Sequence, residues 1–125
     1  DVLNSSLPHF RELQSLLLTR CNINHSALND LISNLNPRLQ QLHLRQCNPA
    51  LEDMHGKFVV QQLASRFPTM KRLDLEGNKL GNATAQTLAD HLCSGWSLNT
   101  LNLKRNCVGD AGAQRLAEVI ARHPA

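Results

Sequence analysis

Aromatic residues are scarce in this sequence, which has three Phe, one Trp and no Tyr among 125 residues. Proteins that hold single-stranded nucleic acids usually stack the bases on aromatic rings, so this composition argues against such a platform. The formal net charge is only +3, and acidic and basic residues are interspersed along the chain. No basic groove for phosphates is indicated, and we expect no nucleic-acid partner.

Long apolar runs are also missing. No stretch reaches the roughly 18 apolar residues of a membrane-spanning helix, and the opening DVLNSSLPHF lacks the basic and apolar regions of a signal peptide. We therefore expect no membrane partner. The first residue is not Met, and we expect the chain to be a segment of a longer protein.

Motifs of metal binding and catalysis are absent as well. The four Cys and six His include no Cys-x-x-Cys and no His-Glu-x-x-His spacing, so no metal site is predicted. The sequence has no glycine-rich phosphate loop and no Ser, His and Asp that one fold register would bring together. We expect no cofactor and no enzyme activity.

What the sequence does contain is a repeated motif. Leu73–Leu92 and Leu101–Ile120 are identical at nine of twenty positions, 28 residues apart. The pattern Leu-x-x-Leu-x-Leu-x-x-(Asn/Cys)-x-apolar occurs four times, with repeats that begin near 13, 39, 70 and 98. Side chains alternate along a strand, so the two residues of each Leu-x-Leu face the same side.

A second pattern with helical spacing follows each motif. The apolar residues recur at i, i+3, i+4 and i+7, which predicts helices buried on one face. The four sets are Leu28, Leu31, Ile32 and Leu35; Val60, Leu63, Ala64 and Phe67; Ala85, Leu88, Ala89 and Leu92; and Ala113, Leu116, Ala117 and Ile120. Ser26, Asn82 and Asp110 precede three of these sets and are predicted to cap the helices.

These repeats resemble the leucine-rich-repeat family, in particular its ribonuclease-inhibitor-like class. The resemblance rests on the Cys or Asn at the turn position, the period near 28 residues and the Gly-Asp-Ala-Gly-Ala sequence at Gly109–Ala113. It implies an α/β fold, a right-handed solenoid with a parallel concave sheet and convex helices. It also implies a reduced, cytoplasmic protein. The length of 125 residues fits one domain over residues 1–125. Cys21 and Cys47 would be neighbours in such a stack, either as thiols or as a disulfide.

The strand residues that flank each Leu-x-Leu are the candidate protein-binding surface. In a stacked sheet they form columns on the face opposite the core, either as a binding platform or as an inert solvated face. The candidates are Leu17, Gln41, His43, Arg45, Arg72, Asp74, Glu76, Asn102, Lys104 and Arg105. Arg45 and Lys104 flank Glu76 and can instead form cross-strand ion pairs with it.

The second repeat departs from the others around Pro49–Lys57. From its first Leu to the end of its helical pattern it is six residues longer than the other three, and Pro49 occupies an apolar position. The insertion is a candidate binding loop with contacts from Glu52, Asp53, Met54 and His55, or else a tolerated extension without a role. Trp96 is likewise either an interface anchor or a cover for the core.

These observations predict a non-catalytic protein–protein interaction module. One alternative is part of a Ran-type GTPase-activating protein, which would stimulate GTP hydrolysis. Another is a structural or autoinhibitory segment that contacts its own parent chain. The ends of the predicted stack carry no polar caps, so self-association through them is a further expectation.

Overall fold

The computed structural model describes residues 14–20, 22–47 and 51–122. Strands and helices alternate along the chain, as the repeated sequence patterns predict. The elements are β1 (Ser15–Thr19), α2 (His25–Asn34), β2 (Gln41–Arg45), α3 (Asp53–Arg66), β3 (Arg72–Asp74), α4 (Asn82–Cys93), β4 (Thr100–Asn102) and α5 (Asp110–Arg122). Leu13, Cys21 and Pro49, which the sequence predictions use, lie outside the described residues.

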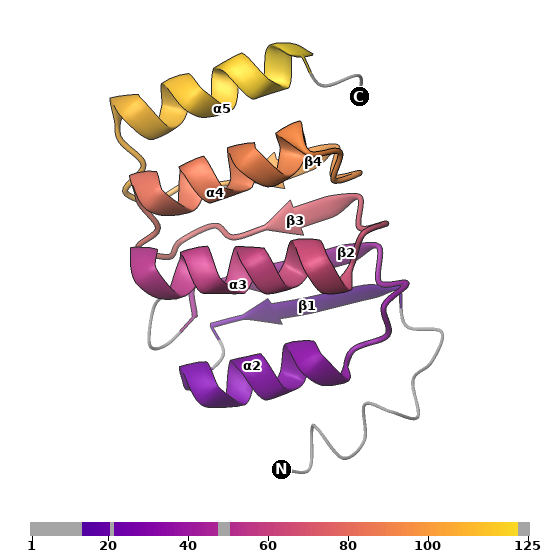
Figure 1. Cartoon of the computed structure of the whole chain (residues 1–125). Coiled ribbons are helices and arrows are strands. Elements are labelled where there is room, and N and C mark those ends of the chain that lie inside the picture. The colour runs from indigo at the N-terminus through magenta and orange to yellow at the C-terminus, as the bar shows by residue number, and fades with distance from the viewer. Residues whose placement is uncertain (1–13, 21, 48–50, 123–125) are drawn as a thin grey trace.

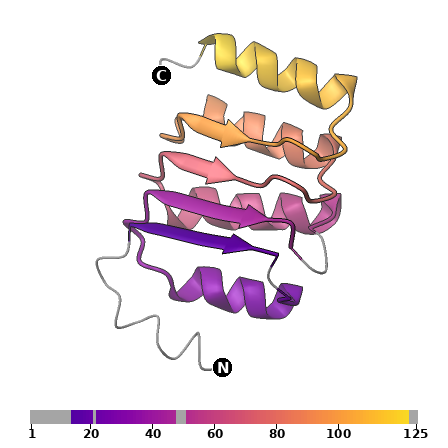
Figure 2. The ribbon, with the colours of Figure 1, turned by 180° about the vertical axis from the view of Figure 1, so that it is seen from behind.

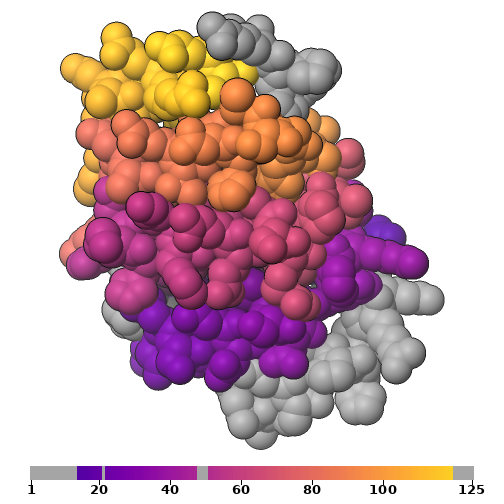
Figure 3. All heavy atoms as spheres, in the orientation of Figure 1, coloured from indigo at the N-terminus to yellow at the C-terminus, as the bar shows by residue number. Residues whose placement is uncertain are grey.

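The strands form one parallel sheet in the order β1-β2-β3-β4. Figure 1 shows the helices stacked in a layer on one side of this sheet, and Figure 2 shows the strands from the other side. Each repeat contributes one level to both layers, so the colours of the space-filling view follow one another in bands (Figure 3). The predicted right-handed α/β solenoid is confirmed.

The core lies between the two layers. Leu42, Leu44, Leu73 and Leu75 are each at most 1% exposed, and the helical sets of α2 and α4 are buried against them. The register pairs Leu16 with Leu42 and Leu73 with Leu101, so equivalent leucines stack across the sheet. At the α5 end, Ala113 and Ala117 are exposed because no described element covers them.

The turn asparagines connect neighbouring repeats. Asn78 donates from Nδ2 to the carbonyls of Leu44 and Leu75, both at 2.9 Å, and its Oδ1 accepts from the Leu51 amide at 3.2 Å. Asn106 makes the equivalent bonds one repeat later, to Leu75 and Leu103 and from Leu80. The Asn at the turn position therefore satisfies backbone groups that would otherwise be buried without a partner.

The helix caps differ from the sequence prediction. Asn24, not Ser26, caps α2, and its Oδ1 accepts from the Ala27 amide at 2.8 Å. Asn82 and Asp110 are the first residues of α4 and α5 rather than the residues before them. The Asn82 Oδ1 accepts from the amides of Gly109 and Gly112, so this side chain caps the following helix.

The burial of Trp96 decides between the two roles that the sequence predicts for it. Trp96 is 5% exposed, and its Nε1 donates to the Phe67 carbonyl at 3.0 Å. Trp96 therefore covers the core between the third and fourth repeats, which is the second of the two roles that the sequence left open.

Candidate functional site

The face of the sheet that points away from the helices carries the predicted binding residues, and we call it the strand face. Along its first column, Gln41, Arg72 and Thr100 are paired in register and are all exposed. Leu17 is 60% exposed on β1, which confirms that this apolar side chain lies on the surface. The strands thus bring the predicted residues together on one continuous surface.

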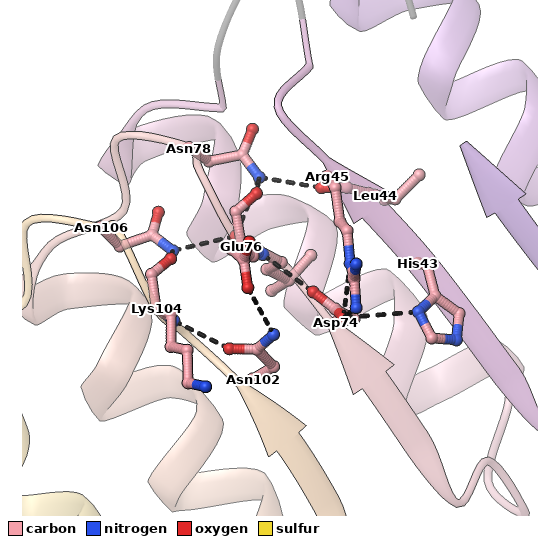
Figure 4. A network of polar contacts seen from close by, with 10 residues as sticks. His43, Leu44, Arg45, Asp74, Glu76, Asn78, Asn102, Lys104 and Asn106 are labelled. Carbon is pink, nitrogen blue, oxygen red and sulfur yellow. Dashed lines mark hydrogen bonds and ion pairs between the residues drawn. The ribbon is translucent and has the colours of Figure 1, made fainter. Parts of the chain in front are cut away.

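Asp74 is the exception, because it is buried although alternation places it on the strand face. It is only 1% exposed and lies beneath the guanidinium of Arg45, whose Nε donates to Asp74 Oδ2 at 2.7 Å (Figure 4). Arg45 Nη2 also contacts this oxygen, and His43 Nδ1 lies 3.4 Å from it. The prediction that Asp74 is a surface contact is wrong, since Arg45 covers it and is positioned by it.

The environment of Asp74 favours its ionised form. Burial raises the pKa of this carboxyl, but hydrogen bonds from Arg45, the Glu76 amide and Asn102, with the charge of Arg45, outweigh burial and lower it. Asp74 therefore stays charged at neutral pH and holds Arg45 in place by a charge-assisted contact.

Glu76 is also engaged within the sheet. Its Oε1 accepts from Asn102 Nδ2 at 3.0 Å, and Asn102 Oδ1 accepts from the Lys104 amide at 3.0 Å (Figure 4). Of the cross-strand ion pairs considered from the sequence, Arg45 makes its pair with Asp74 instead of Glu76. Lys104 and Arg105 have exposed side chains at the end of this network.

A row of left-handed residues follows the strands. Arg20, Gln46 and Arg105 have φ of 57°, 50° and 58°, and Gly77 occupies the same position after β3 with φ of 77°. Non-glycine residues in this region carry a strain of roughly 1–3 kcal/mol each, and they persist only where contacts with the surrounding structure fix the backbone. The holding bonds run between repeats: the amides of Arg20, Gln46 and Gly77 donate to the carbonyls of Arg45, Glu76 and Lys104.

Arg20 lies beside the predicted binding residues but is not among the sequence-based candidates. It is exposed, and its Nε donates to the Gln46 Oε1 at 2.8 Å, so two members of the left-handed row are joined by their side chains. Its position just after β1, equivalent to that of Arg105 after β4, is the signal in the sequence that would have found it. We call Arg20, Arg45, Lys104 and Arg105 the exit rim, because they lie where the strands end.

The insertion before α3 has a structural consequence. Asp53 precedes the buried Leu63 by ten positions, whereas Asn82 precedes the equivalent Leu88 by six. Four of the six extra residues therefore lengthen the start of α3. Among the predicted loop contacts, Glu52 and His55 are exposed and Met54 is 78% exposed. The His55 ring also packs on that of His25, with ring centroids 3.6 Å apart.

Asp53 differs from its neighbours in the insertion. Its carboxylate accepts from the amides of Gly81, Ala83 and Thr84 at 2.8–3.1 Å and from the Thr84 hydroxyl at 2.7 Å. These bonds satisfy the start of α4, so the side chain caps a neighbouring helix. Burial raises the pKa of Asp53, but the bonds from Thr84, Gly81 and Ala83 lower it overall. This arrangement leaves Asp53 little freedom to contact a partner.

The helix face offers a different kind of surface. A shallow hollow of about 370 Å³ lies between α2 and α3, and it is lined by Ser33, Phe58, Gln61, Gln62, Ser65 and Arg66.

No group of three or more His, Cys, Asp or Glu in the described part of the chain is arranged to hold a metal ion. Among the described helices, none is long and apolar enough to cross a membrane.

Comparisons with known proteins agree with this geometry. The family described as "Leucine Rich repeat" matches residues 68–89 and 97–117. The chain is 31% identical over 106 residues to "NACHT, LRR and PYD domains-containing protein 3" of Mus musculus, and 30% identical over 112 residues to "Ribonuclease inhibitor" of Sus scrofa. These alignments cover 85% and 88% of this chain.

The chain is a leucine-rich-repeat protein of the ribonuclease-inhibitor-like class. It spans 10% of the length of the first of these relatives and 24% of the second. Among solved structures, the tropomodulin C-terminal domain of Caenorhabditis elegans matches with a TM-score of 0.70 over 98% of this chain and 91% of that one. With 13% sequence identity, that likeness concerns the leucine-rich-repeat fold alone.

Proposed function

We propose that this chain is a non-catalytic module that binds a partner protein on its strand face and exit rim. The observation that carries the proposal is the fixed row of polar side chains there, in which Asp74 positions Arg45, Glu76 engages Asn102 and Gln46 engages Arg20. Side chains that are already ordered lose less conformational entropy on binding, so such a surface is suited to recognition.

Two further features support this surface over the helix face. Leu17 adds an exposed apolar contact beside the polar row, and apolar side chains within a polar surface are common in protein interfaces. The strand face also carries an exposed column of Gln41, Arg72 and Thr100, whose positions are set by the sheet register. Varying these residues leaves the buried leucines unchanged, so the surface can be specific without altering the fold.

The proposal extends to the organisation and location of the chain. One sheet and one core join all four described strands, which supports a single domain. The described cysteines Cys93 and Cys107 carry free thiols, which supports a reducing, cytoplasmic location. Self-association through the ends of the stack stays a prediction, and the mass of the chain measured in solution tests it.

A position-resolved cross-linking experiment tests the binding face. A photo-reactive amino acid is placed at Gln41 or Thr100 on the strand face, and at Gln86 or Gln114 on α4 and α5 as matched controls, all exposed positions. We expect one protein to be cross-linked in cells from the strand-face positions and not from the helix positions. Cross-links from the helix positions alone, or only to further copies of the chain, would overturn the proposal.

A further inference from the structure

The exposed charges of this molecule are unevenly distributed between its two faces. On the helix face, the exposed acids Asp30, Asp90 and Glu118 are accompanied by the bases Lys57 and Arg115, and Arg115 Nη2 lies 3.2 Å from Asp90. The strand face and exit rim carry Arg20, Arg45, Arg72, Lys104 and Arg105. Five basic side chains are therefore gathered on the strand face and exit rim.

The acids on that side do not cancel these charges at the surface. Among the described residues they are Asp74 and Glu76; Asp74 is 1% exposed beneath Arg45, and Glu76 is half-buried and accepts from Asn102. The carboxylate of Asp74 neutralises only the charge of Arg45, with which it forms an ion pair. Arg20, Arg72, Lys104 and Arg105 then face solvent without a carboxylate in the described contacts.

Backbone geometry adds a second, independent observation. Arg20 and Arg105 stand at positive φ, where glycine is the favoured residue, as Gly77 illustrates in the same row. Arginine at these positions stores strain that the fold itself does not require. Strained residues of this kind are concentrated at functional sites.

The occupant follows from charge and dimensions. Adjacent strands lie about 4.8 Å apart, so the rim from β1 to β4 spans about 14 Å, the length of roughly five extended residues. We infer that the exit rim binds an extended acidic segment of a partner protein, whose carboxylates face Arg20 and Arg45 at one end and Lys104 and Arg105 at the other. This inference rests on the proposed function, since it names the chemistry recognised by the same surface.

A nucleic acid is the competing anionic ligand, and the side chains disfavour it. Single strands are held by stacking on aromatic rings, and among the described residues the aromatics are elsewhere: Phe67 and Trp96 are buried, and Phe58 lies on α3. A segment of mixed acidic and polar side chains fits the alternating donors and acceptors better.

An NMR titration tests this chemistry directly. The isotope-labelled chain is titrated with an oligo-glutamate peptide of about five residues, and with an oligo-lysine peptide and an oligothymidine of matched length. We expect saturable amide shifts at Arg20, Lys104 and Arg105 with oligo-glutamate only. The affinity derived from these shifts should fall as the salt concentration rises. Absent shifts, shifts confined to the helix face, or equal shifts with oligothymidine would overturn the inference.

Charge variants sharpen the result. Lys104→Glu with Arg105→Glu should weaken oligo-glutamate binding at least about ten-fold. The matched pair Arg38→Glu with Lys71→Glu should leave it unchanged, because both residues are exposed and lie before β2 and β3, at the opposite ends of the strands. Arg105→Gly should weaken binding without lowering the unfolding midpoint, because glycine relieves the positive φ. Equal losses in both double variants would overturn the inference.

The two proposals fail in distinguishable ways. Cross-linking at Gln41 and Thr100 reports the binding face and is independent of charge at the exit rim. If the strand face is cross-linked but oligo-glutamate causes no amide shifts, the inference of an acidic segment is overturned, while the proposed binding face is retained. Cross-links from the helix face alone would instead overturn the proposed function itself.

Discussion

The carboxylate of Asp53 accepts hydrogen bonds from both the backbone amide and the hydroxyl of Thr84, one repeat away in the stack. Asn82 repeats the arrangement toward the amides of Gly109 and Gly112. The first residue of one helix thus caps the next helix in both α3 and α4. The free amides at a helix start, which usually find a cap within their own segment, here hold adjacent repeats together.

Asp53→Ala is therefore expected to destabilise the stack by about 2 kcal/mol, because the start of α4 loses its acceptor while it remains partly buried. Urea denaturation followed by circular dichroism measures this loss as a lower midpoint. Asp53→Asn is the matched control: Asn82 already fills the equivalent role, so this variant should lose less than Asp53→Ala. Equal losses in the two variants would show that the hydrogen bonds to α4 are not the cause.

Much of this fold was predictable from local patterns. Leu42 and Leu44 face the core because side chains alternate, and Leu88 and Leu92 do so because of helical spacing. Asn78 could be assigned to a turn because Asn106 occupies the same position in the next repeat, 28 residues later. These are residues whose surroundings are set by the element in which they stand.

The sequence did not predict the long-range contacts of the charged residues. Alternation assigns Asp74 to the solvent side, and only the neighbouring strand reveals that Arg45 lies over it. The sequence predicts Asp53 as a loop contact, because its acceptor role depends on a helix that begins 29 positions later. It predicts Ser26 as a cap, whereas Asn24 is the residue with extended backbone geometry before α2.

We expect Asn78→Ala and Asn106→Ala to lower the free energy of unfolding by different amounts. In Asn78→Ala, the Leu44 carbonyl loses a donor and the Leu51 amide loses its acceptor in a buried setting, at a cost of about 2–4 kcal/mol. Leu75 is still bonded to Asn106. Asn106→Ala should cost less because Asn106 is half-buried, and water can reach its partners. A comparison of the two unfolding midpoints checks this order, and a larger loss for Asn106→Ala would contradict it.

Acid should weaken the stack through Asp53 and Asp74, whose pKa values are both lowered in the folded chain. The unfolded chain takes up these protons first as the pH falls. The stabilisation is therefore fully present above about pH 5 and declines as the pH falls through about 4 toward the lowered pKa values of the folded chain. The free energy of unfolding, measured at neutral pH and at about pH 3, should therefore fall. In Asp53→Asn the fall should be smaller, and an unchanged pH dependence would exclude Asp53 as a contributor.

Gly56 lies where α3 passes closest to the neighbouring repeat. A Cβ built at this residue would stand 2.2 Å from Leu80 Cδ2 and 2.7 Å from Thr84 Oγ1, the hydroxyl that Asp53 binds. Gly56→Ala gains about 1 kcal/mol of helix propensity but must displace these buried atoms, so we expect a net loss of about 1–2 kcal/mol.

The same substitution in a Leu80→Ala background separates these two effects. Removing the Leu80 side chain removes the closer of the two contacts, so the added methyl group of Gly56→Ala should then cost little or stabilise α3. Urea midpoints of the wild type, both single variants and the double variant give the coupling free energy. If Gly56→Ala costs as much without Leu80 as with it, the close approach of α3 to Leu80 does not limit this position, and Thr84 alone would have to account for the loss.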